Sequence, residues 1–545
     1  MLLLVLNWQL SAQKKNGFSF PLDSPYVLTA NYGELRPNHF HAGLDFSTGG
    51  QVNLPVYAAA DGYVYRIKVS ATGYGKCLYI THANGKVTVY GHLNSYSIKI
   101  SDLVKKEQYA QESYEVEFFP KPFMVPIKKG EIIGLSGSTG NSTGPHLHFE
   151  IRDEKSEAPL NPLEFLSYPD RTRPMIQTVA LYSLSDTLAP KPFKQIRVLQ
   201  NDDDVLLPDN PLINIDNPYI GIAFAGYDRF TPAGSPNNIY IARLYFDGRL
   251  IYSHKLSGIF FDDTRYINEY SETNGGLKFQ KCFLPETYPT EMIGRAVNRG
   301  RILLRDSGFH MIKLLVEDEW GNENDIQFHV RCGKPLQYTG PALKSDLFVN
   351  CRKDFVYAKN GVKLTIPANT LFYSTPLVVE NTLSASGKLI IFPGDANLRV
   401  PAIVAFKLAP HQLKNKHKLV LKCGQQEYTP RLSADSACFY IKSFGGFQLT
   451  EDHQAPKIIP QFKAKRNKVP VASSMLGFII TDALSGIGKY KLYLNNKFVI
   501  AEYDAKADLL FYKFDDESPK GKINIRLEVE DRAGNRSKFE GVVRR

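Results

Sequence analysis

The sequence predicts an all-β chain built from several domains. At 545 residues it is longer than one hydrophobic core usually supports. Short runs of alternating apolar and polar residues recur, as at residues 76–81 and 86–90, and turn signals such as Asn84-Gly85 separate them. Helical periodicity is scarce, and residues 162–166 predict only one short helical turn. Hydrophobic residues make up 43% of the chain, which excludes a largely disordered protein.

The start of the chain predicts a secretory signal peptide. Residues 1–10 are mostly apolar. The small residues Ser11 and Ala12, which precede Lys14, are typical of the cleavage site of a signal peptide. We therefore assign residues 1–13 to a signal peptide. No Lys or Arg precedes the apolar stretch, a departure that a truncated start would explain. No later segment approaches the ~20 apolar residues of a membrane span. We expect an exported protein of the periplasm or cell envelope, or a secreted one, without a transmembrane span.

The net charge of the chain indicates which kinds of binding partner to expect. The formal net charge is +11, but the basic residues are spread along the chain. No basic cluster with interleaved aromatic residues is present, so a nucleic-acid partner is not expected. An anionic cell envelope fits this charge better. The sequence does not predict an oligomeric state.

The six cysteines give little evidence of a disulfide framework. None forms a Cys-x-x-Cys pair, which excludes a structural zinc knuckle. Cys423 and Cys438 flank a predicted hairpin, and they would either form a disulfide or remain two buried thiols. Cys77 lies in an apolar strand and is predicted to be a core residue.

Proline-rich breaks divide the chain into four predicted units: residues 14–170, 171–335, 336–452 and 453–545. The second and fourth units end alike, with a strand followed by Val-Glu-Asp-x-x-Gly-Asn at residues 316–322 and 529–535. This repeat resembles the turn before the last strand of bacterial immunoglobulin-like domains. It predicts immunoglobulin-like β-sandwiches for both units. The third unit is predicted to be a β-rich module of unknown topology.

Histidines are concentrated in the first unit. Six of the twelve lie within residues 39–148, namely His39, His41, His82, His92, His146 and His148. Clustering of this kind indicates a metal site or a proton-transfer site.

Residues 146–151 predict a strand because apolar residues occupy every second position. The apolar side chains would face the core, and His146, His148 and Glu150 would share the opposite face. Two imidazoles on one face of a strand can bind a metal. The other interpretation of this segment alone is an exposed polar face.

A second segment adds a carboxylate. His41 and Asp45 lie four residues apart, and nitrogen and carboxylate oxygen are both zinc ligands. Joined to the His-x-His segment at residues 146–148, this segment would give a set of two histidines and one aspartate, which leaves a fourth position open, as a catalytic zinc site requires. His92 follows directly after an alternating strand, in Tyr90-Gly91-His92.

These three segments, in this order, resemble the LytM or lysostaphin-type zinc endopeptidases, peptidase family M23. The resemblance also includes the connecting residues 125–134 and 137–144, and it covers residues 25–165, under a third of the chain. It implies an N-terminal antiparallel β-sheet peptidase domain. No phosphate-binding loop or His-Glu-x-x-His motif competes with it.

The resemblance implies a role for each site residue. His41, Asp45 and His148 would bind one Zn²⁺, which lowers the pKa of a bound water toward ~7. His92 and His146 would be the catalytic histidines, one accepting and one donating a proton. Which of the two does which stays open. Spacing alone would also allow His146 as a ligand.

Other polar residues of the unit have weaker expectations. His39 would at most line the groove, and His82 is expected to be structural. Tyr90 is either a core residue or a donor behind the ligands. Residues 95–124 form an insertion that would either be a lid or hairpin bordering the groove, or serve only as a structural addition.

The leading functional prediction is an exported zinc metalloendopeptidase that hydrolyses peptide bonds in the stem or cross-bridge peptides of peptidoglycan. One alternative is a non-catalytic regulator that activates a cell-wall amidase. The other is an envelope-binding scaffold in which the C-terminal β-modules act independently of zinc.

Overall fold

The computed structural model describes residues 17–25, 27–167, 170–184, 190–201, 206–231, 234–289, 292–334, 347–381, 388–393, 396–462 and 474–545. The signal-peptide prediction and the predicted boundary at residues 335–336 lie outside these ranges. Strands make up most of the described elements, which confirms an all-β, multi-domain chain. The exact domain boundaries stay a prediction.

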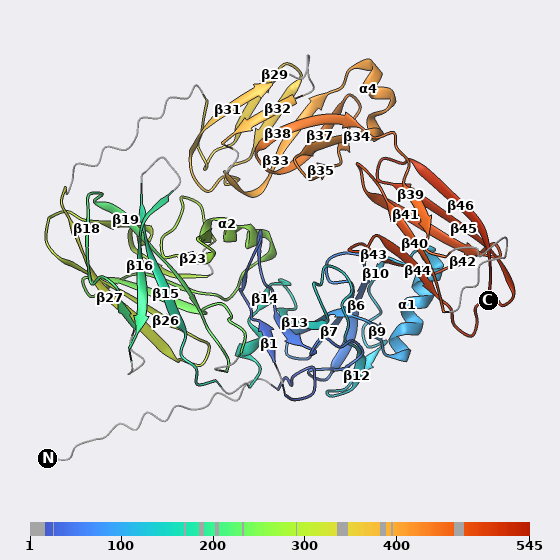
Figure 1. Cartoon of the computed structure of the whole chain (residues 1–545), viewed down its shortest axis with the longest axis horizontal. Coiled ribbons are helices and arrows are strands. Elements are labelled where there is room, and N and C mark those ends of the chain that lie inside the picture. The colour runs from blue at the N-terminus through green and yellow to red at the C-terminus, as the bar shows by residue number, and fades with distance from the viewer. Residues whose placement is uncertain are drawn as a thin grey trace.

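The four units follow one another around a closed ring, with the fourth unit returning to the first beside helix α1 (Ile98–Gln111) (Figure 1). Hydrophobic packing continues across three of the junctions, and Phe372 of the third unit belongs to the core of the second. Tyr32 and Phe40 of the first unit belong to the core of the second, and Tyr490 of the fourth packs against the core of the first. Polar contacts at the four junctions join Asn31 to Asn238, Arg265 to Leu398, Lys418 to Asn535 and Lys76 to Glu502.

The first unit is an antiparallel sheet in the order β1-β4-β13-β8-β7-β6-β10, with a small second sheet β5-β12-β9. Its strands are β1 (Leu28–Ala30), β2 (Leu35–Arg36), β3 (His39–Phe40), β4 (Leu44–Ser47), β5 (Pro55–Tyr57), β6 (Gly62–Val69), β7 (Lys76–Thr81), β8 (Lys86–Leu93), β9 (Ser95–Tyr96), β10 (Val116–Phe118), β11 (Pro126–Ile127), β12 (Ile132–Leu135), β13 (His146–Asp153) and β14 (Pro159–Leu160). The predicted helical turn is the 3₁₀ helix η1 (Pro162–Glu164).

The period-two pattern of β13 has the predicted effect. Leu147, Phe149 and Ile151 are fully buried in the core of the first unit. His148 and Glu150 on the other face are buried as well. The interpretation of this face as exposed is therefore wrong, because other parts of the unit cover it.

The insertion at residues 95–124 contains α1, a helix that the sequence analysis missed. Ile100 and Val104 lie one turn apart on α1 and pack into the core. The following strand β10 pairs with β6 at the edge of the sheet, and β7 and β6 separate it from β8. This position supports a structural addition and not a lid over the histidines of β8 and β13.

The second unit consists of two sheets around one core. The first has the order β17-β16-β15-β19-β23-β22, with β25 attached to β19, and the second has the order β18-β27-β26-β20-β21-β24. The elements are β15 (Met175–Ser183), β16 (Lys191–Gln200), β17 (Leu206–Pro208), β18 (Leu212–Ile215), β19 (Tyr219–Tyr227), β20 (Ile241–Phe246), β21 (Arg249–Lys255), η2 (Phe261–Tyr266), α2 (Ile267–Tyr270), β22 (Ser271–Asn274), β23 (Leu277–Lys281), β24 (Ile293–Ala296), η3 (Val297–Gly300), β25 (Ile302–Leu303), β26 (His310–Glu317) and β27 (Glu323–Cys332).

The third unit has sheets β28-β31-β32-β38-β34-β35 and β29-β30-β33-β37-β36. Its elements are β28 (Leu347–Val349), β29 (Phe355–Lys359), β30 (Val362–Ile366), β31 (Thr375–Asn381), β32 (Lys388–Phe392), β33 (Asn397–Lys407), α4 (Pro410–Lys414), η4 (Lys416–Lys418), β34 (Leu419–Cys423), β35 (Gln426–Tyr428), β36 (Arg431–Leu432), β37 (Ser436–Ser443) and β38 (Gly445–Glu451).

The fourth unit has two four-stranded sheets, β39-β40-β44-β43 and β42-β41-β45-β46. Its strands are β39 (Lys457–Pro460), β40 (Met475–Thr481), β41 (Ile487–Leu494), β42 (Lys497–Val499), β43 (Glu502–Asp504), β44 (Leu509–Lys513), β45 (Lys522–Asp531) and β46 (Arg536–Arg544). Buried residues of both sheets form one core, as in a β-sandwich. An immunoglobulin-like topology for the second and fourth units stays a prediction.

All six cysteines are free thiols. Cys423 ends β34 and Cys438 lies on β37, and these strands belong to different sheets. The disulfide interpretation of this pair is therefore wrong. Cys77 is fully buried, which confirms the prediction that it is a core residue.

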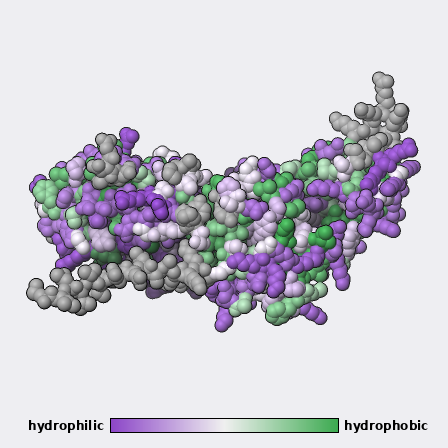
Figure 2. All heavy atoms as spheres, turned by 90° about the horizontal axis from the view of Figure 1, so that it is seen from below, coloured by the Kyte–Doolittle hydropathy of each residue, from purple (hydrophilic) through white to green (hydrophobic). Residues whose placement is uncertain are grey.

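Hydrophilic residues cover most of the face shown in Figure 2, and hydrophobic residues appear on it as separate patches. The exposed hydrophobic residues include Phe119, Phe123 and Met124 of the insertion. None of the described helices is long and apolar enough to span a membrane.

Candidate metal centre and active site

Strand register brings the predicted ligands together. On the central strand β13, His148 lies opposite Asp45 of β4 on one side and opposite Gly91 of β8 on the other. His41 lies in the loop between β3 and β4, four residues before Asp45. Neighbouring antiparallel strands therefore place residues from the beginning and the end of the unit side by side.

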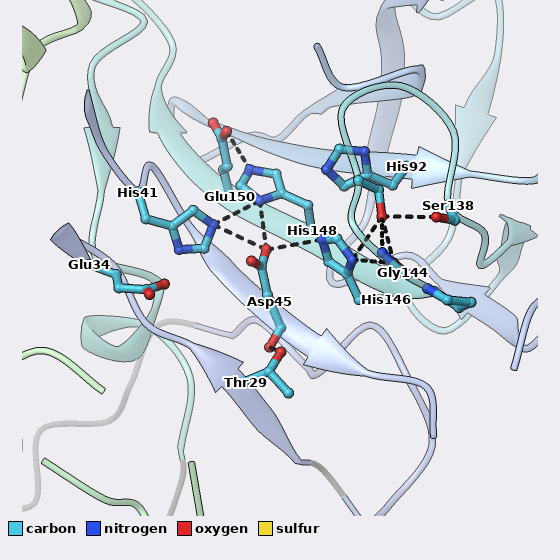
Figure 3. A network of polar contacts seen from close by, with 12 residues as sticks. Thr29, Glu34, His41, Asp45, His92, Ser138, Gly144, His146, His148 and Glu150 are labelled. Atoms are coloured by element: carbon cyan, nitrogen blue, oxygen red, sulfur yellow. Dashed lines mark hydrogen bonds and ion pairs between the residues drawn. The ribbon is translucent and has the colours of Figure 1, made fainter. Parts of the chain in front are cut away.

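The side chains of His41, Asp45 and His148 converge (Figure 3). His41 Nε2 is 3.1 Å from Asp45 Oδ1, and His148 Nδ1 is 2.9 Å from the same oxygen. The two nitrogens are 3.0 Å apart. Two imidazole nitrogens and one carboxylate oxygen at these distances could hold a metal ion.

The second nitrogen of each of these histidines is held by another group. His41 Nδ1 donates to the carbonyl oxygen of Asn31 at 2.8 Å. His148 Nε2 donates to Glu150 Oε1 at 2.7 Å. In the neutral rings that bind a metal, these bonds fix the tautomers, because a ring nitrogen that donates leaves the other nitrogen with its lone pair.

The carboxylates are oriented by arginines. Arg36 donates to Asp45 Oδ2 at 2.5 Å, which leaves Oδ1 directed at the two histidines. Arg152 donates through Nε to Glu150 Oε2 at 2.6 Å. The ring of Tyr74 stacks on His148 with centroids 4.9 Å apart. Neighbours thus hold the side chains before any ligand binds.

The electrostatics agree with a cation site. Burial lowers the pKa of His41 more than Asp45 raises it. Burial also opposes a charge on His148, but its hydrogen bonds to Asp45 and Glu150 raise its pKa to about 9. The pKa of Asp45 lies well below its ordinary value because the histidines outweigh its burial. Asp45 is therefore ionised, as a metal ligand must be.

His92 and His146 lie beside this cluster. Their ring centroids are 4.7 Å apart, and His146 Nε2 is 3.6 Å from Asp45 Oδ1. His92 Nδ1 donates to the carbonyl of Thr139 at 2.7 Å, and His146 Nδ1 donates to the carbonyl of Gly144 at 2.8 Å. In both rings Nε2 therefore remains available to accept or donate a proton. Burial, together with the neighbouring imidazoles, lowers the pKa of His92 to about 3.

An irregular backbone conformation at the end of β8 sets the direction of the His92 side chain. Its φ of 60° is in the left-handed region, which is rare for a residue with a side chain. The pairing of β7 with β8 shifts register between Lys76 and Leu78, which lie opposite Leu93 and Tyr90. Such a bulge redirects a side chain at the end of a strand. Backbone strain of this kind is concentrated at functional sites.

The sequence model of peptidase family M23 matches residues 39–111 and 125–162. These ranges contain all five predicted site residues, in the geometry just described. The N-terminal unit is a peptidase family M23 domain. The match is interrupted only at residues 112–124, so the segment outside the family pattern is shorter than the predicted insertion.

Curated proteins share this domain. The chain is 37% identical over 168 residues to the DD-carboxypeptidase/endopeptidase Mpg of Neisseria meningitidis. The aligned segment covers 30% of this chain and 32% of that protein. It is 33% identical over 138 residues to the peptidoglycan DD-endopeptidase ShyA of Vibrio cholerae, covering 24% and 26%. The matched segment thus spans about a third or less of these relatives.

A solved structure is similar to about a quarter of the chain. The catalytic domain of the antimicrobial peptidase lysostaphin from Staphylococcus simulans is 28% identical, with a TM-score of 0.20. The similarity covers 26% of this chain and 91% of that domain.

The remaining histidines of the M23 domain lie outside the cluster. His39 is exposed and its ring contacts the Pro37 carbonyl. His82 contacts the Asp61 carbonyl at 2.8 Å and Thr88 Oγ1 at 2.8 Å, as expected of a structural residue. Tyr90 is fully buried in the core, so the core interpretation is confirmed.

Several supporting residues of the M23 domain were missed from the sequence. Asn31 accepts the hydrogen bond of His41 through its backbone carbonyl. Every residue has such a carbonyl, so the sequence does not indicate this role. Arg36 and Tyr74 are separated in sequence from the residues that they orient. Only Arg152 had a local signal, because it continues the polar face of β13 two residues after Glu150.

The fourth unit contacts the glycine-rich turn of the M23 domain. Lys506 Nζ donates to the carbonyl oxygens of Ser138 and Ser142 at 2.6 and 3.2 Å. The hydroxyl of Ser142 lies 3.2 Å from His146 Nδ1. The C-terminal unit therefore supports the turn that borders the candidate active site.

Proposed function

We propose that this chain is an exported zinc metalloendopeptidase that hydrolyses peptide bonds in peptidoglycan. The observation that carries the proposal is the convergence of His41 Nε2, Asp45 Oδ1 and His148 Nδ1 inside an M23 domain. The clustered donors suit Zn²⁺, since all three bind it readily and leave a position open.

In this proposal His41, Asp45 and His148 hold one Zn²⁺. When bound, the metal supplies Lewis-acid chemistry that polarises a peptide carbonyl and activates water. Arg36 and Glu150 keep the ligand atoms directed at one point, which limits the reorganisation needed on binding.

His92 and His146 are the proposed catalytic histidines. Each ring donates through Nδ1 to a backbone carbonyl and so presents Nε2. One Nε2 accepts the proton of the attacking water, and the other imidazole donates to the developing oxyanion or to the leaving amine. The short distance between the rings allows both to reach the same scissile bond.

The substrate follows from the relatives and from the charge. The curated relatives include proteins named as DD-carboxypeptidase/endopeptidase and peptidoglycan DD-endopeptidase, which favours a D,D-cross-link between stem peptides. The formal net charge of +11 suits an anionic wall. Because such a substrate lies outside the cytoplasm, export is part of the proposal.

The test uses the zinc-loaded full chain and purified peptidoglycan. Released fragments are identified by mass spectrometry, and bound zinc is measured by elemental analysis. We expect cleavage of cross-linked muropeptides that a chelator abolishes. A His148→Ala variant should lose both zinc and activity.

His39→Ala is the matched control, because His39 is an exposed histidine of the same domain outside the cluster. It should retain zinc and activity. Cleavage that persists in a metal-free His148→Ala variant would overturn the proposal. A zinc-loaded chain that cuts nothing but stimulates a wall amidase would favour the regulator, and binding to peptidoglycan without either effect would favour the scaffold.

A further inference from the structure

A second group of acidic side chains lies at the junction of the M23 domain and the second unit. One carboxylate oxygen from each of Asp170, Asp228 and Asp318 lies within 4.8 Å of the others. Glu319 follows Asp318 and bonds through Oε1 to Asn161 of the M23 domain at 2.9 Å. The group therefore lies where η1 of the first unit meets the turn after β26.

The carboxylate of Asp228 is buried and lacks a hydrogen-bond partner that would replace its lost hydration. It is 1% exposed, and neither of its carboxylate oxygens has a hydrogen-bond partner among the described residues. Two further oxygens nearby also lack partners within the described chain, namely Asp170 Oδ2 and Glu319 Oε2. A buried carboxylate without a partner is costly, and native proteins usually pair it or use it to bind a metal.

The electrostatic environment of Asp228 is strongly negative. Burial, followed by the charges of Glu319, Asp318 and Asp170, raises its pKa to about 8. Burial also raises the pKa of Glu319 to about 7. No positively charged side chain is among the main influences on the pKa of either group. A bound cation would supply the missing positive charge.

The fourth unit repeats this arrangement with Asp452, Asp482 and Asp531, which also bring carboxylate oxygens within 4.8 Å of one another. Asp228 directly follows β19, and Asp482 directly follows β40. Equivalent places in two units therefore carry equivalent carboxylates.

The local hydrogen bonds are repeated as well. In the second unit, Asn322 Nδ2 donates to Asp318 Oδ2 at 2.6 Å and to the carbonyl of Asp170 at 3.4 Å. In the fourth unit, Asn535 Nδ2 donates to the side chain of Asp531 at 2.7 Å and to the carbonyl of Asp452 at 3.1 Å. The repeated Val-Glu-Asp-x-x-Gly-Asn turn thus ties its aspartate to the residue at which the preceding predicted unit ends.

We propose that Asp170, Asp228 and Asp318 bind a calcium ion. The donors are all oxygens, which suits a hard cation and disfavours zinc. Calcium binds oxygen at about 2.4 Å, so ligands on opposite sides of the ion are about 4.8 Å apart. Three clustered carboxylates would replace several waters of a bound ion, and magnesium gives up its waters reluctantly, which favours calcium.

The proposed ion would join two units. Asp170 lies in the linker that leaves the M23 domain, and Asp228 and Asp318 belong to the second unit. Trp320, two residues after Asp318, packs on Phe230 with centroids 5.7 Å apart, and both belong to the packing of the M23 core. Calcium would therefore stabilise the orientation of the M23 domain on the ring.

Trp320 provides a local probe of this site. Its amide donates to Asp318 Oδ1 at 2.8 Å. The chain has two tryptophans, Trp8 and Trp320, so a Trp8→Phe background leaves a single tryptophan beside the proposed ion. Terbium replaces calcium in oxygen sites and emits when a nearby tryptophan is excited.

The experiment titrates terbium into the full chain in this background, after metal removal and reloading with one equivalent of Zn²⁺. We expect tryptophan-sensitised emission that calcium displaces, with magnesium at least about 10-fold less effective. Asp228→Asn should weaken terbium binding by about 10-fold or more. This variant removes a buried charge and is expected to fold, which its circular dichroism spectrum verifies.

Asp482→Asn is the matched control, because it changes the equivalent residue of the fourth unit. It should leave the emission from the Trp320 site unchanged. Calorimetric titration of calcium provides a second readout, in which Asp228→Asn should lose one binding site relative to its parent. Emission that calcium does not displace, or an Asp228→Asn variant that binds terbium and calcium as its parent does, would overturn the proposal.

Discussion

Each histidine of the M23 site has one ring nitrogen committed to a neighbour and one left for chemistry. Backbone carbonyls hold His41, His92 and His146, whereas the Glu150 carboxylate holds His148. A carboxylate partner makes an imidazole a stronger ligand than a carbonyl partner does. His148 is therefore the ligand most dependent on a single supporting side chain.

Glu150→Gln should lower zinc affinity by about 10–100-fold, because the amide no longer supports His148 with a negative charge. Competition with a chromophoric zinc chelator measures the change. Glu157→Gln, at an exposed carboxylate of the same domain, should bind zinc normally. Unchanged affinity in a folded Glu150→Gln variant would show that Glu150 has no such role.

A buried histidine far from the site makes stability depend on pH. His254 is 1% exposed and lies between the hydroxyls of Tyr252 and Tyr270. Burial lowers its pKa to about 3. In the unfolded chain the pKa is about 6.5, so between these values the unfolded state binds more protons and stability falls as the pH falls.

His254→Gln should therefore reduce the acid sensitivity of the second unit. Between pH 6.5 and 5, the wild type should lose about 2 kcal/mol of unfolding free energy through this group, and the variant should not. Scanning calorimetry at both pH values measures the difference for the transition that the variant affects. Equal pH slopes in the two proteins would contradict the prediction.

At the scale of the strands, the site depends on how closely β4 approaches β13. Gly43 lies between two ligands, and a Cβ atom there would lie 2.2 Å from the carbonyl oxygen of Phe149. Neither backbone can yield without disturbing the register that aligns Asp45 with His148. The glycine therefore allows the approach of the two strands on which the proposed metal site depends.

Gly43→Ala should lower both the melting temperature and the zinc content of the protein. The backbone clash forces β4 away from β13 and separates the ligands. Thermal melting and elemental analysis measure the two effects. Gly144→Ala is the control, since a Cβ atom at Gly144 has no heavy atom within 4 Å. A Gly43→Ala protein with normal melting and zinc content would contradict this explanation.

At the scale of the whole molecule, the ring returns the fourth unit to the M23 domain. Lys76 Nζ is 2.8 Å from Glu502 Oε2, and both side chains are partly buried. Lys491 forms a second ion pair with Glu112 at 2.6 Å, just after α1. Because Lys506 supports the turn beside His146, closure of the ring contributes to the surroundings of the active site.

Glu502→Lys should weaken ring closure, because it places two cations together at a partly buried contact. Small-angle scattering should show a larger radius of gyration. The double variant with Lys76→Glu restores opposite charges and should recover much of the compact form. Identical scattering from Glu502→Lys and the wild type would show that this pair does not hold the ring closed.

The sequence determined the parts of this protein that depend on local patterns. Strand alternation predicted the all-β class and the buried face of β13, and the resemblance to peptidase family M23 predicted His41, Asp45, His92, His146 and His148 as the site residues. The helix α1 was not predicted, because its buried apolar residues are limited to Ile100 and Val104, which is too short a pattern to show helical periodicity.

The tertiary structure decided everything that joins distant residues. Asn31 supports His41 through a backbone carbonyl, and Lys506 reaches Ser138 across 368 residues of sequence. The turn at Asp318 could be recognised locally, but its meeting with Asp228 and Asp170 could not. Such contacts have no local spacing rule, because packing between units brings them together only after the strands have formed.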